Sequence, residues 1–350
     1  MVGWAFIRNF AVMNHPDRQP WLDYVRCFSI FLVILFHTPP RLPILDDAVI
    51  LNLRVPVFFC ISGFLFSTER ATQSVRYLLR RCRLILVPYT VFFLFFYALW
   101  LVVGRTLVGA EEQAIPIVRP LAEFVMGNPH VVVGPFWYLA CLLSMLLIYY
   151  GLSRIVPTAW MLPVCLLLAV AACFLPKVQV WNVSNALMFL PFYALGNSFR
   201  PLLAQMRFSG TASTVQLCLL AAISIAVMVA MKTLGVNDPA TYNVVRIGAG
   251  LMVIPAYLCA GRWLAERYGR RRWIEVMVMG GTIYLALQNY AIGIIKIGMN
   301  HAFYAGVMDD HAWLKPVVAI VVAAAIYPAA WWLLKHAPWV LGKGCDEALK

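Results

Sequence analysis

The chain has 350 residues, of which 63% are hydrophobic and only 12% are charged, and its net charge at pH 7 is +13. A soluble globule of this size needs far more polar surface than such a composition supplies, so the composition excludes a soluble fold. We therefore expect an all-α polytopic membrane protein.

Apolar runs long enough to cross roughly 30 Å of hydrocarbon recur about ten times along the chain. They cover residues 21–38, 48–67, 84–104, 132–153, 158–176, 183–199, 213–231, 243–260, 277–299 and 316–334. These runs predict a bundle of about ten transmembrane helices. The transmembrane domain is expected at 21–335, between a cytoplasmic N-terminal segment at 1–20 and a cytoplasmic tail at 336–350.

The positive charges gather in alternate loops of this bundle. Clusters of Arg follow the runs at 48–67 and 243–260, and in a ten-span bundle these loops fall on the same side as both termini. Cytoplasmic loops of membrane proteins carry the excess of Lys and Arg, so we predict that both termini are cytoplasmic. The basic charge then reports topology, and no nucleic-acid partner is expected.

The first span carries two ionisable residues, Arg26 and His37, eleven positions apart. Eleven helical residues advance about 1100°, close to a whole number of turns, and rise roughly 16 Å, so both side chains share one face at different depths. Ionisable groups at membrane depth are costly and usually functional. Two alternatives stay open: His37 is an interfacial ring two residues before Pro39, or Arg26 only anchors the helix by pairing with Asp23.

Further along the chain, Arg80 and Arg83 share a face at the start of the third span. Guanidinium groups bind phosphates through paired hydrogen bonds, although a topological role explains each Arg equally well. Ser62 and Gly63 lie near the cytoplasmic end of the second span. Small residues there permit close helix packing, and the Ser62 hydroxyl is also available as a hydrogen-bond donor.

Two aromatic and polar pairs are weaker candidates. Trp137 and Tyr138 are expected near the outer interface, where an aromatic belt is common and where sugars also stack on aromatic rings. Tyr284 and Gln288 make a polar stripe with Gly281 in the ninth span, so we expect that face to look inward. The cysteines sit singly without metal-ligand spacing, so neither disulfides nor a metal site is expected. No permanently bound cofactor is expected either.

Several stretches resemble the integral-membrane acyltransferase-3 family of bacterial glycan O-acyltransferases. The matching stretches are LDYVR at 22–26 followed by His37, VFFCISGFL at 57–65, RRCRLILVP at 80–88, PFWYL at 135–139 and FLPFYALG at 189–196. Their order and spacing agree with the family as well. One departure is clear: relatives often carry Tyr-Leu-x-His in a late helix, whereas this chain has YLALQN at 284–289, where Gln288 is a candidate substitute.

The resemblance implies a multi-pass enzyme of the bacterial cytoplasmic (inner) membrane that moves an acyl group, usually acetyl, from cytoplasmic acyl-CoA to a sugar hydroxyl. An alcohol needs a base to become a good nucleophile, and His37 is the expected base, with Arg26 deeper on the same helix face along the catalytic path. No Asp or Glu lies deep in a predicted span, so a carboxylate base would have to come from a loop. Arg80, Arg83 and Ser62 are expected to bind acyl-CoA.

Trp137, Tyr138, Tyr284 and Gln288 are the candidates for binding the acceptor. Exopolysaccharide, O-antigen and lipid-linked oligosaccharide all remain open as acceptors, as do acetyl and succinyl as the acyl group. Membrane lipids and proteins of polysaccharide assembly are the other expected partners. The alternative from another class is a transporter or flippase for a lipid-linked sugar, although no repeat relates the two halves of the chain.

Overall fold

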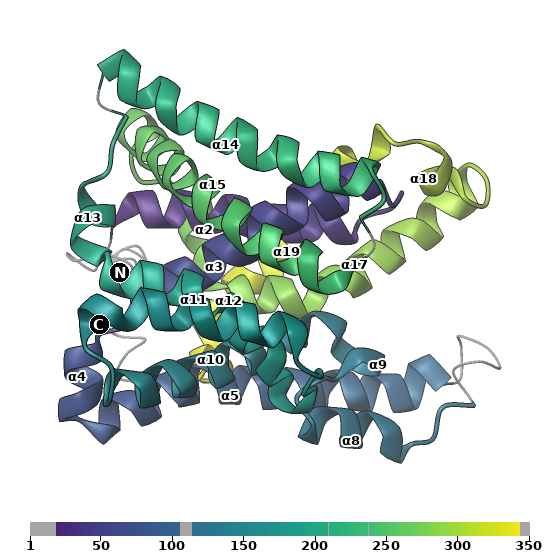
Figure 1. Ribbon diagram of the computed structural model, residues 1–350. Coiled ribbons are helices and arrows are strands. Elements are labelled where there is room, and N and C mark those ends of the chain that lie inside the picture. Colours follow the sequence, from purple (N-terminus) through teal and green to yellow (C-terminus); the bar gives the residue numbers. More distant parts are fainter. Residues whose placement is uncertain (1–18, 106–113, 209, 237, 344–350) are drawn as a thin grey trace, which may run out of the picture.

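A computed structural model of the chain describes residues 19–105, 114–208, 210–236 and 238–343, and within these ranges it is helical with no strand. The helices of the first half are α2 (Pro20–His37), η2 (Ile44–Ile50), α3 (Leu51–Phe64), α4 (Thr68–Gln73), α5 (Val75–Leu99), η3 (Trp100–Gly104), α8 (Val118–Val125), α9 (His130–Val133), η4 (Gly134–Phe136), α10 (Trp137–Ser153) and α11 (Thr158–Phe174). The long helices lie side by side, with α4 and α13 at one end of the bundle and α9 and α18 at the other (Figure 1).

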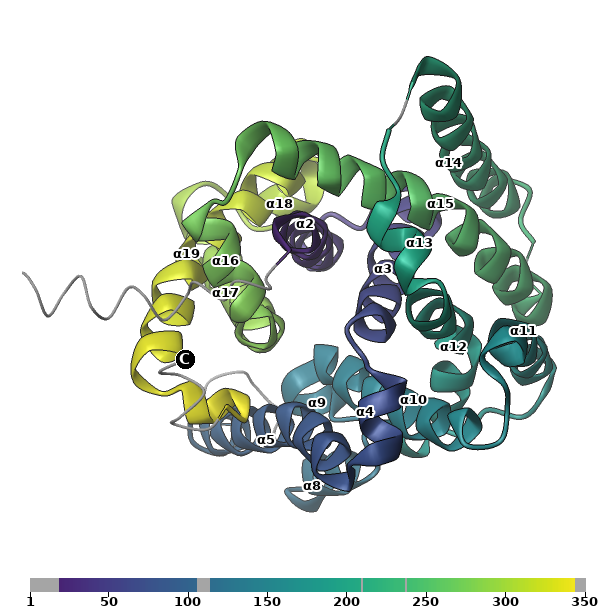
Figure 2. The same cartoon turned by 90° about the vertical axis from the view of Figure 1, so that its left-hand side faces the viewer.

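The second half continues the same bundle. Its helices are η5 (Val180–Asn182), α12 (Val183–Ser198), α13 (Arg200–Gln205), α14 (Gly210–Thr233), α15 (Pro239–Tyr268), α16 (Arg272–Met279), α17 (Gly281–Ala302), α18 (Val307–Asp310), α19 (Leu314–His336) and η6 (Pro338–Leu341). α14 lies at the edge, where it packs mainly on α15 (Figure 2). Asp238 caps α15 by accepting hydrogen bonds from Thr241, and these bonds hold the pKa of that carboxyl below its ordinary value.

An all-helical multi-pass membrane protein is confirmed, but the number of ten spans is not. Six helical segments of the described ranges are long and apolar enough to cross a membrane. They are Pro20–His37, Val75–Gly104, His130–Ser153, Gly210–Thr233, Pro239–Tyr268 and Leu314–His336. The runs expected at 48–67, 158–176 and 183–199 form the shorter helices α3, α11 and α12, each with an internal proline.

The run expected as one span at 277–299 is divided into two helices. α16 and α17 meet at Gly280 with a bend of 83°, and counting them as one broken span would make a seventh. A Cβ added at Gly280 would lie 3.0 Å from the Val276 carbonyl oxygen and 3.1 Å from the Ala330 Cβ. The chain therefore bends at a position where α19 leaves little room for a side chain.

Helix α2 lies among other helices rather than at the edge. Pro20 occupies its first turn, where no backbone N–H is needed. Its last turn is closed by Thr38, whose N–H and hydroxyl both donate to the Ile34 carbonyl, at 3.0 Å and 2.9 Å. α2 packs against α3, α15, α16, α17 and α19, and α3, α15 and α16 flank it in the end-on view (Figure 2). The helix that carries both Arg26 and His37 is thus packed against helices from both halves of the chain.

Helices α3 and α12 approach each other backbone to backbone. A Cβ added at Gly63 would lie 2.0 Å from the Tyr193 carbonyl oxygen, and one at Gly196 would lie 1.9 Å from the Cys60 carbonyl oxygen. Next to this contact, the Asn197 amide donates to the carbonyl oxygens of Gly63 (3.1 Å) and Phe66 (2.6 Å). The two glycines therefore decide how close the serine-bearing end of α3 lies to α12.

Candidate active site

His37 is the last residue of α2 and is half-buried at the end of the bundle that also holds α18. Its ring stands edge-on to Phe36, with the ring centroids 5.2 Å apart. Three cations, Arg54 on α3, Arg41 after α2 and Lys315 on α19, lie close enough to act on the imidazole electrostatically. The expected base is therefore surrounded by positive charge contributed by three separate segments.

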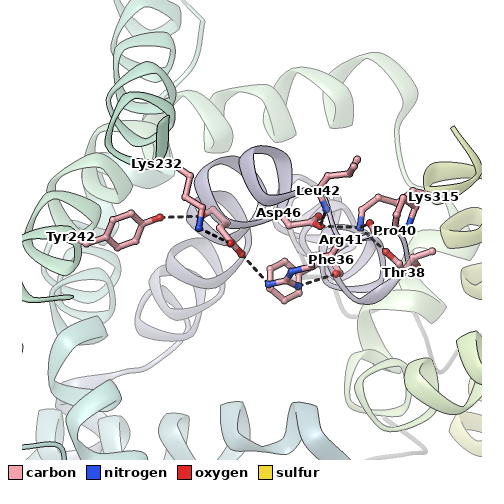
Figure 3. A network of polar contacts seen from close by, with 10 residues as sticks. Phe36, Thr38, Pro40, Arg41, Leu42, Asp46, Lys232, Tyr242 and Lys315 are labelled. Carbon is pink, nitrogen blue, oxygen red and sulfur yellow. Dashed lines mark hydrogen bonds and ion pairs between the residues drawn. The ribbon is translucent and has the colours of Figure 1, made fainter. Parts of the chain in front are cut away.

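The segment after His37 is fastened to α19 by Lys315, which is 1% exposed. Its ammonium donates to the carbonyl oxygens of Thr38 (2.5 Å) and Pro40 (2.9 Å), as Figure 3 shows. It also pairs with Asp46 Oδ2 at 3.1 Å, and the same oxygen accepts the Leu42 N–H at 2.7 Å. One buried ammonium therefore positions the chain that follows the histidine.

Asp46 is a carboxylate from outside the predicted spans that nevertheless lies inside the protein. It lies in η2, which continues without interruption into α3, and it is fully buried. The sequence places it two residues before the apolar run at 48–67, and it places Lys315 just before the last run. Lys315 was expected on the side opposite the cytoplasm, and the packing of α19 beside α2 brings it together with Asp46 inside the protein.

A second chain of contacts leads from the same segment to α14 and α15 (Figure 3). Arg41 pairs with Asp47 Oδ1 at 2.9 Å, and Lys232 on α14 pairs with Asp47 Oδ2 at 3.1 Å. The Tyr242 hydroxyl on α15 donates to the Asp47 carbonyl at 3.4 Å. Arg41 also stacks over the Phe36 ring at 4.0 Å. The surroundings of His37 are thus tied to helices far apart in sequence.

Breaking the buried pair is expected to destabilise the protein strongly. Lys315→Met leaves Asp46 buried without its cation, which costs about 3–5 kcal/mol, whereas the double variant with Asp46→Leu recovers most of that loss. The melting temperature of the purified protein in detergent measures both effects. Lys296→Gln is the matched control, because its partner Asp309 is exposed and such pairs contribute at most about 1 kcal/mol. If Lys315→Met were as stable as the Lys296→Gln control, Lys315 would have no structural role.

Three of the expected site residues meet deeper in the bundle. Tyr138 on α10 lies beside the Ser62 hydroxyl of α3 and within electrostatic reach of Arg26 on α2. Its ring stacks on Phe59, with the centroids 5.1 Å apart. Ser62 itself donates to the Phe58 carbonyl at 2.8 Å. Tyr138 was expected at the outer interface with Trp137, but the structure groups it with Arg26 and Ser62, two residues expected on the donor path.

Arg80 and Arg83 lie together on α5 and are exposed, as their shared face predicts. The neighbouring Arg81, explained from sequence as a topology signal, has a structural role instead. Its guanidinium donates to the Leu65 carbonyl and, at 3.1 Å, to the Tyr77 hydroxyl. η6, near the end of the described chain, packs on the same part of α5, where Gly342 lies against the Arg83 backbone.

The stripe expected to look inward is buried. Tyr284 is 1% exposed and Gln288 is fully buried, and α17 packs against α2, α19 and η4. Both the amide nitrogen and the amide oxygen of Gln288 lack a hydrogen-bond partner in the described residues. Leaving a buried amide without hydrogen bonds raises the free energy of the folded protein. A ligand that hydrogen-bonds to Gln288 would remove this penalty without breaking any existing bond. Nothing in the described contacts joins Gln288 to His37.

Sequence reasoning missed Arg54, whose side chain is 5% exposed. It was counted among the outer charges, although it lies inside the apolar run at 48–67. A charge within such a run is costly and usually functional, and that signal was available in the sequence. Asp46 and Lys315 had no comparable signal, because each lies outside the run nearest to it.

The fold and this arrangement define a multi-pass helical membrane protein with a cation-rich site around a histidine. A family model of acyltransferase-3 proteins, described as an acyltransferase domain, matches residues 19–335. The chain belongs to this family, as the motifs at 22–88 indicated, and the family makes it a membrane acyltransferase. Comparisons with curated proteins and with solved structures gave no match.

Proposed function

We propose that the protein is an O-acyltransferase of the bacterial cytoplasmic membrane that moves an acyl group, most simply acetyl, from cytoplasmic acyl-CoA to a sugar hydroxyl. The observation that carries the proposal is that one helix, α2, bears both His37 and Arg26, roughly 16 Å apart along its axis. Arg26 lies on the side of Ser62 and Tyr138, and His37 lies at the opposite end.

In this proposal both termini are cytoplasmic and acyl-CoA docks at Arg80 and Arg83. Its pantetheine arm extends past Ser62 and Arg26, so that the thioester reaches His37. His37 takes the proton of the acceptor hydroxyl, and the oxygen attacks the thioester carbonyl. The tetrahedral intermediate then expels the CoA thiolate, which takes the proton back from His37 and leaves the imidazole neutral. The cations around His37 stabilise the negative charge that develops on the carbonyl oxygen.

The acceptor in this proposal is an exopolysaccharide, an O-antigen or a lipid-linked oligosaccharide. Trp137, Tyr284 and Gln288 are proposed to contact it, with Gln288 in the place of the histidine found in many relatives. Tyr138, which lies beside Ser62, fits better with the thioester path. No permanently bound cofactor takes part in this scheme, because acyl-CoA itself supplies the activated group.

Radiolabelled acetyl-CoA given to the purified protein in lipid nanodiscs, with a panel of candidate glycans, tests the proposal. Label on a glycan supports it. The broken α16–α17 pair favours the alternative of a transporter for a lipid-linked sugar, because broken helices are common at transporter binding sites. Movement of such a sugar across proteoliposomes without any acyl transfer would replace the proposal with that alternative.

Arg80→Ala and Arg83→Ala are each expected to raise the KM for acyl-CoA about 10-fold or more with little change in kcat. A hydrogen bond to a charged phosphate contributes about 1.5–3 kcal/mol, and binding made equally in ground state and transition state changes KM alone. Initial rates across a range of acyl-CoA concentrations measure this. Arg76→Ala, an exposed cation of the same helix, is the control. Equal loss of rate at saturating acyl-CoA would argue against docking.

A further inference from the structure

Arg54 is a buried cation that forms no ion pair with a carboxylate among the described residues. It lies near the start of α3, its side chain is 5% exposed, and its Nε has no hydrogen-bond partner in the described residues. Its guanidinium lies 3.7 Å from the centroid of the Phe36 ring, next to His37. A cation–π contact recovers only part of the free energy that a charge loses on leaving water.

Arg246 on α15 is a second cation of the same kind. Its guanidinium lies 4.9 Å from the centroid of the Phe189 ring, and its buried Nε also lacks a partner in the part of the chain that the structure describes. The helices that carry the two arginines, α3 and α15, pack against each other, and the two positive charges repel. Two like charges held together away from water are unfavourable unless an anion lies between them or beside them.

Neither neighbouring carboxylate forms an ion pair with Arg54 or Arg246 among the described residues. Asp47 pairs with Arg41 and Lys232. Asp46 lies within electrostatic reach of Arg54, but its Oδ2 pairs with Lys315 and its buried Oδ1 has no hydrogen-bond partner in the described residues. The cations Arg41, Lys232 and Lys315 therefore each have a carboxylate partner, whereas Arg54 and Arg246 have none among the described residues. Positive charge is in surplus beside His37.

We propose that Arg54 and Arg246 form a binding site for a carboxylate carried by one of the two substrates. The inference rests on the proposed acyl transfer at His37. Guanidinium groups bind carboxylates through paired hydrogen bonds, and a site held by two of them is selective for that group. Arg54 stacks on Phe36, the residue before His37, so a carboxylate bound by Arg54 lies close to the proposed base.

Either the acceptor or the donor could carry the carboxylate that binds Arg54 and Arg246. The acceptor would carry it on an acidic sugar, such as a uronic acid, and the donor on a dicarboxylic acyl group, such as succinyl. The phosphates of CoA do not fit, because they are separated from the thioester by the length of the pantetheine arm. The site therefore selects which substrate reacts, whereas His37 performs the chemistry.

The first arm of the test measures binding without any reaction. Succinate and glucuronate, at ionic strength balanced with chloride, are expected to raise the melting temperature of the purified full-length protein in detergent. Arg54→Gln and Arg246→Gln are expected to abolish this rise. Without the probes, each variant melts at or above the temperature of the unaltered protein, because one of two repelling buried charges is removed. Unchanged stabilisation by the probes in both variants would overturn the site.

The second arm compares substrates that differ only in the carboxylate. The donors are succinyl-CoA and acetyl-CoA, and the acceptors are glucuronic-acid and glucose oligosaccharides. In Arg54→Gln we expect kcat/KM to fall at least about 10-fold for the carboxylate-bearing member of one pair and less than about 3-fold for its neutral twin. The pair that shows the difference identifies whether donor or acceptor carries the group. Lys296→Gln, which removes a paired and exposed cation, is the control.

Equal losses for charged and neutral twins would overturn the inference, because Arg54 would then act on the reacting centre or on the fold. If the unaltered protein transfers nothing between any of these substrates, the proposed function fails, and the melting experiment alone decides the carboxylate site. If Arg54→Gln does not yield folded protein, Arg246→Gln is used for the same comparison of kcat/KM between charged and neutral substrates.

Discussion

Replacing His37 by alanine is expected to lower acyl transfer by about 10²- to 10⁴-fold, the contribution typical of a positioned general base. The protein should still accumulate and keep its melting temperature, because His37 is half-buried at the end of α2 and its ring contacts mainly Phe36. The measurement is the initial rate of label transfer at saturating acyl-CoA, with membrane abundance followed in parallel.

His130→Ala is the matched control for this experiment. His130 begins α9 and is exposed, so its loss should leave the rate unchanged. His37→Asn provides a second test, because asparagine keeps hydrogen-bonding capacity but cannot take a proton. Turnover of the His37→Asn variant close to that of the unaltered protein would remove His37 from the role of base and reduce it to an interfacial ring.

A methyl group added at Gly196 is expected to prevent the native packing of α3 against α12. The added carbon would lie 1.9 Å from the Cys60 carbonyl oxygen, and the clash is with backbone, which cannot rotate away. Overpacking of a well-packed core typically costs about 1–3 kcal/mol, and a backbone clash as close as this one lies at or beyond the upper end. Gly196→Ala should therefore give little monodisperse protein on size-exclusion chromatography in detergent.

Gly63→Ala should behave in the same way, because its added carbon would lie 2.0 Å from the Tyr193 carbonyl oxygen. Gly248→Ala is the control: Gly248 lies within α15, and no atom of its surroundings comes within 4 Å of an added Cβ. Since alanine is a better helix former than glycine, this variant should be as stable as the unaltered protein. Normal yield and melting temperature for Gly196→Ala would show that α3 and α12 are able to separate at this contact.

Much of the architecture follows from local sequence. Long apolar runs predict membrane helices without knowledge of their neighbours, because each helix satisfies its own backbone hydrogen bonds. This reasoning found α2, α5, α10, α14, α15 and α19 in their places. It overestimated the number of long spans, because α3, α11 and α12 are shorter than their apolar runs. It also missed the 83° bend between α16 and α17.

Within the site, sequence periodicity identified the shared helix of Arg26 and His37, and the motifs at 22–88 indicated the family. The partners of these residues depend on contacts between distant segments. Tyr138 joins Arg26 and Ser62 only because α10 packs near α2 and α3, and a side chain assigned to the outer interface by its place in the chain lies inside the bundle instead.

The sequence by itself determined the helical membrane fold, the family and the helix that carries the expected base, because these depend on composition, hydrophobic runs and spacing along one chain segment. Only the tertiary structure decided which charges are neutralised. Lys315 meets Asp46, 269 positions away, whereas Arg54 and Arg246, on the packed helices α3 and α15, form no ion pair with a carboxylate among the described residues. The energy of a buried charge depends on what lies beside it in space, and helix packing alone sets those neighbours.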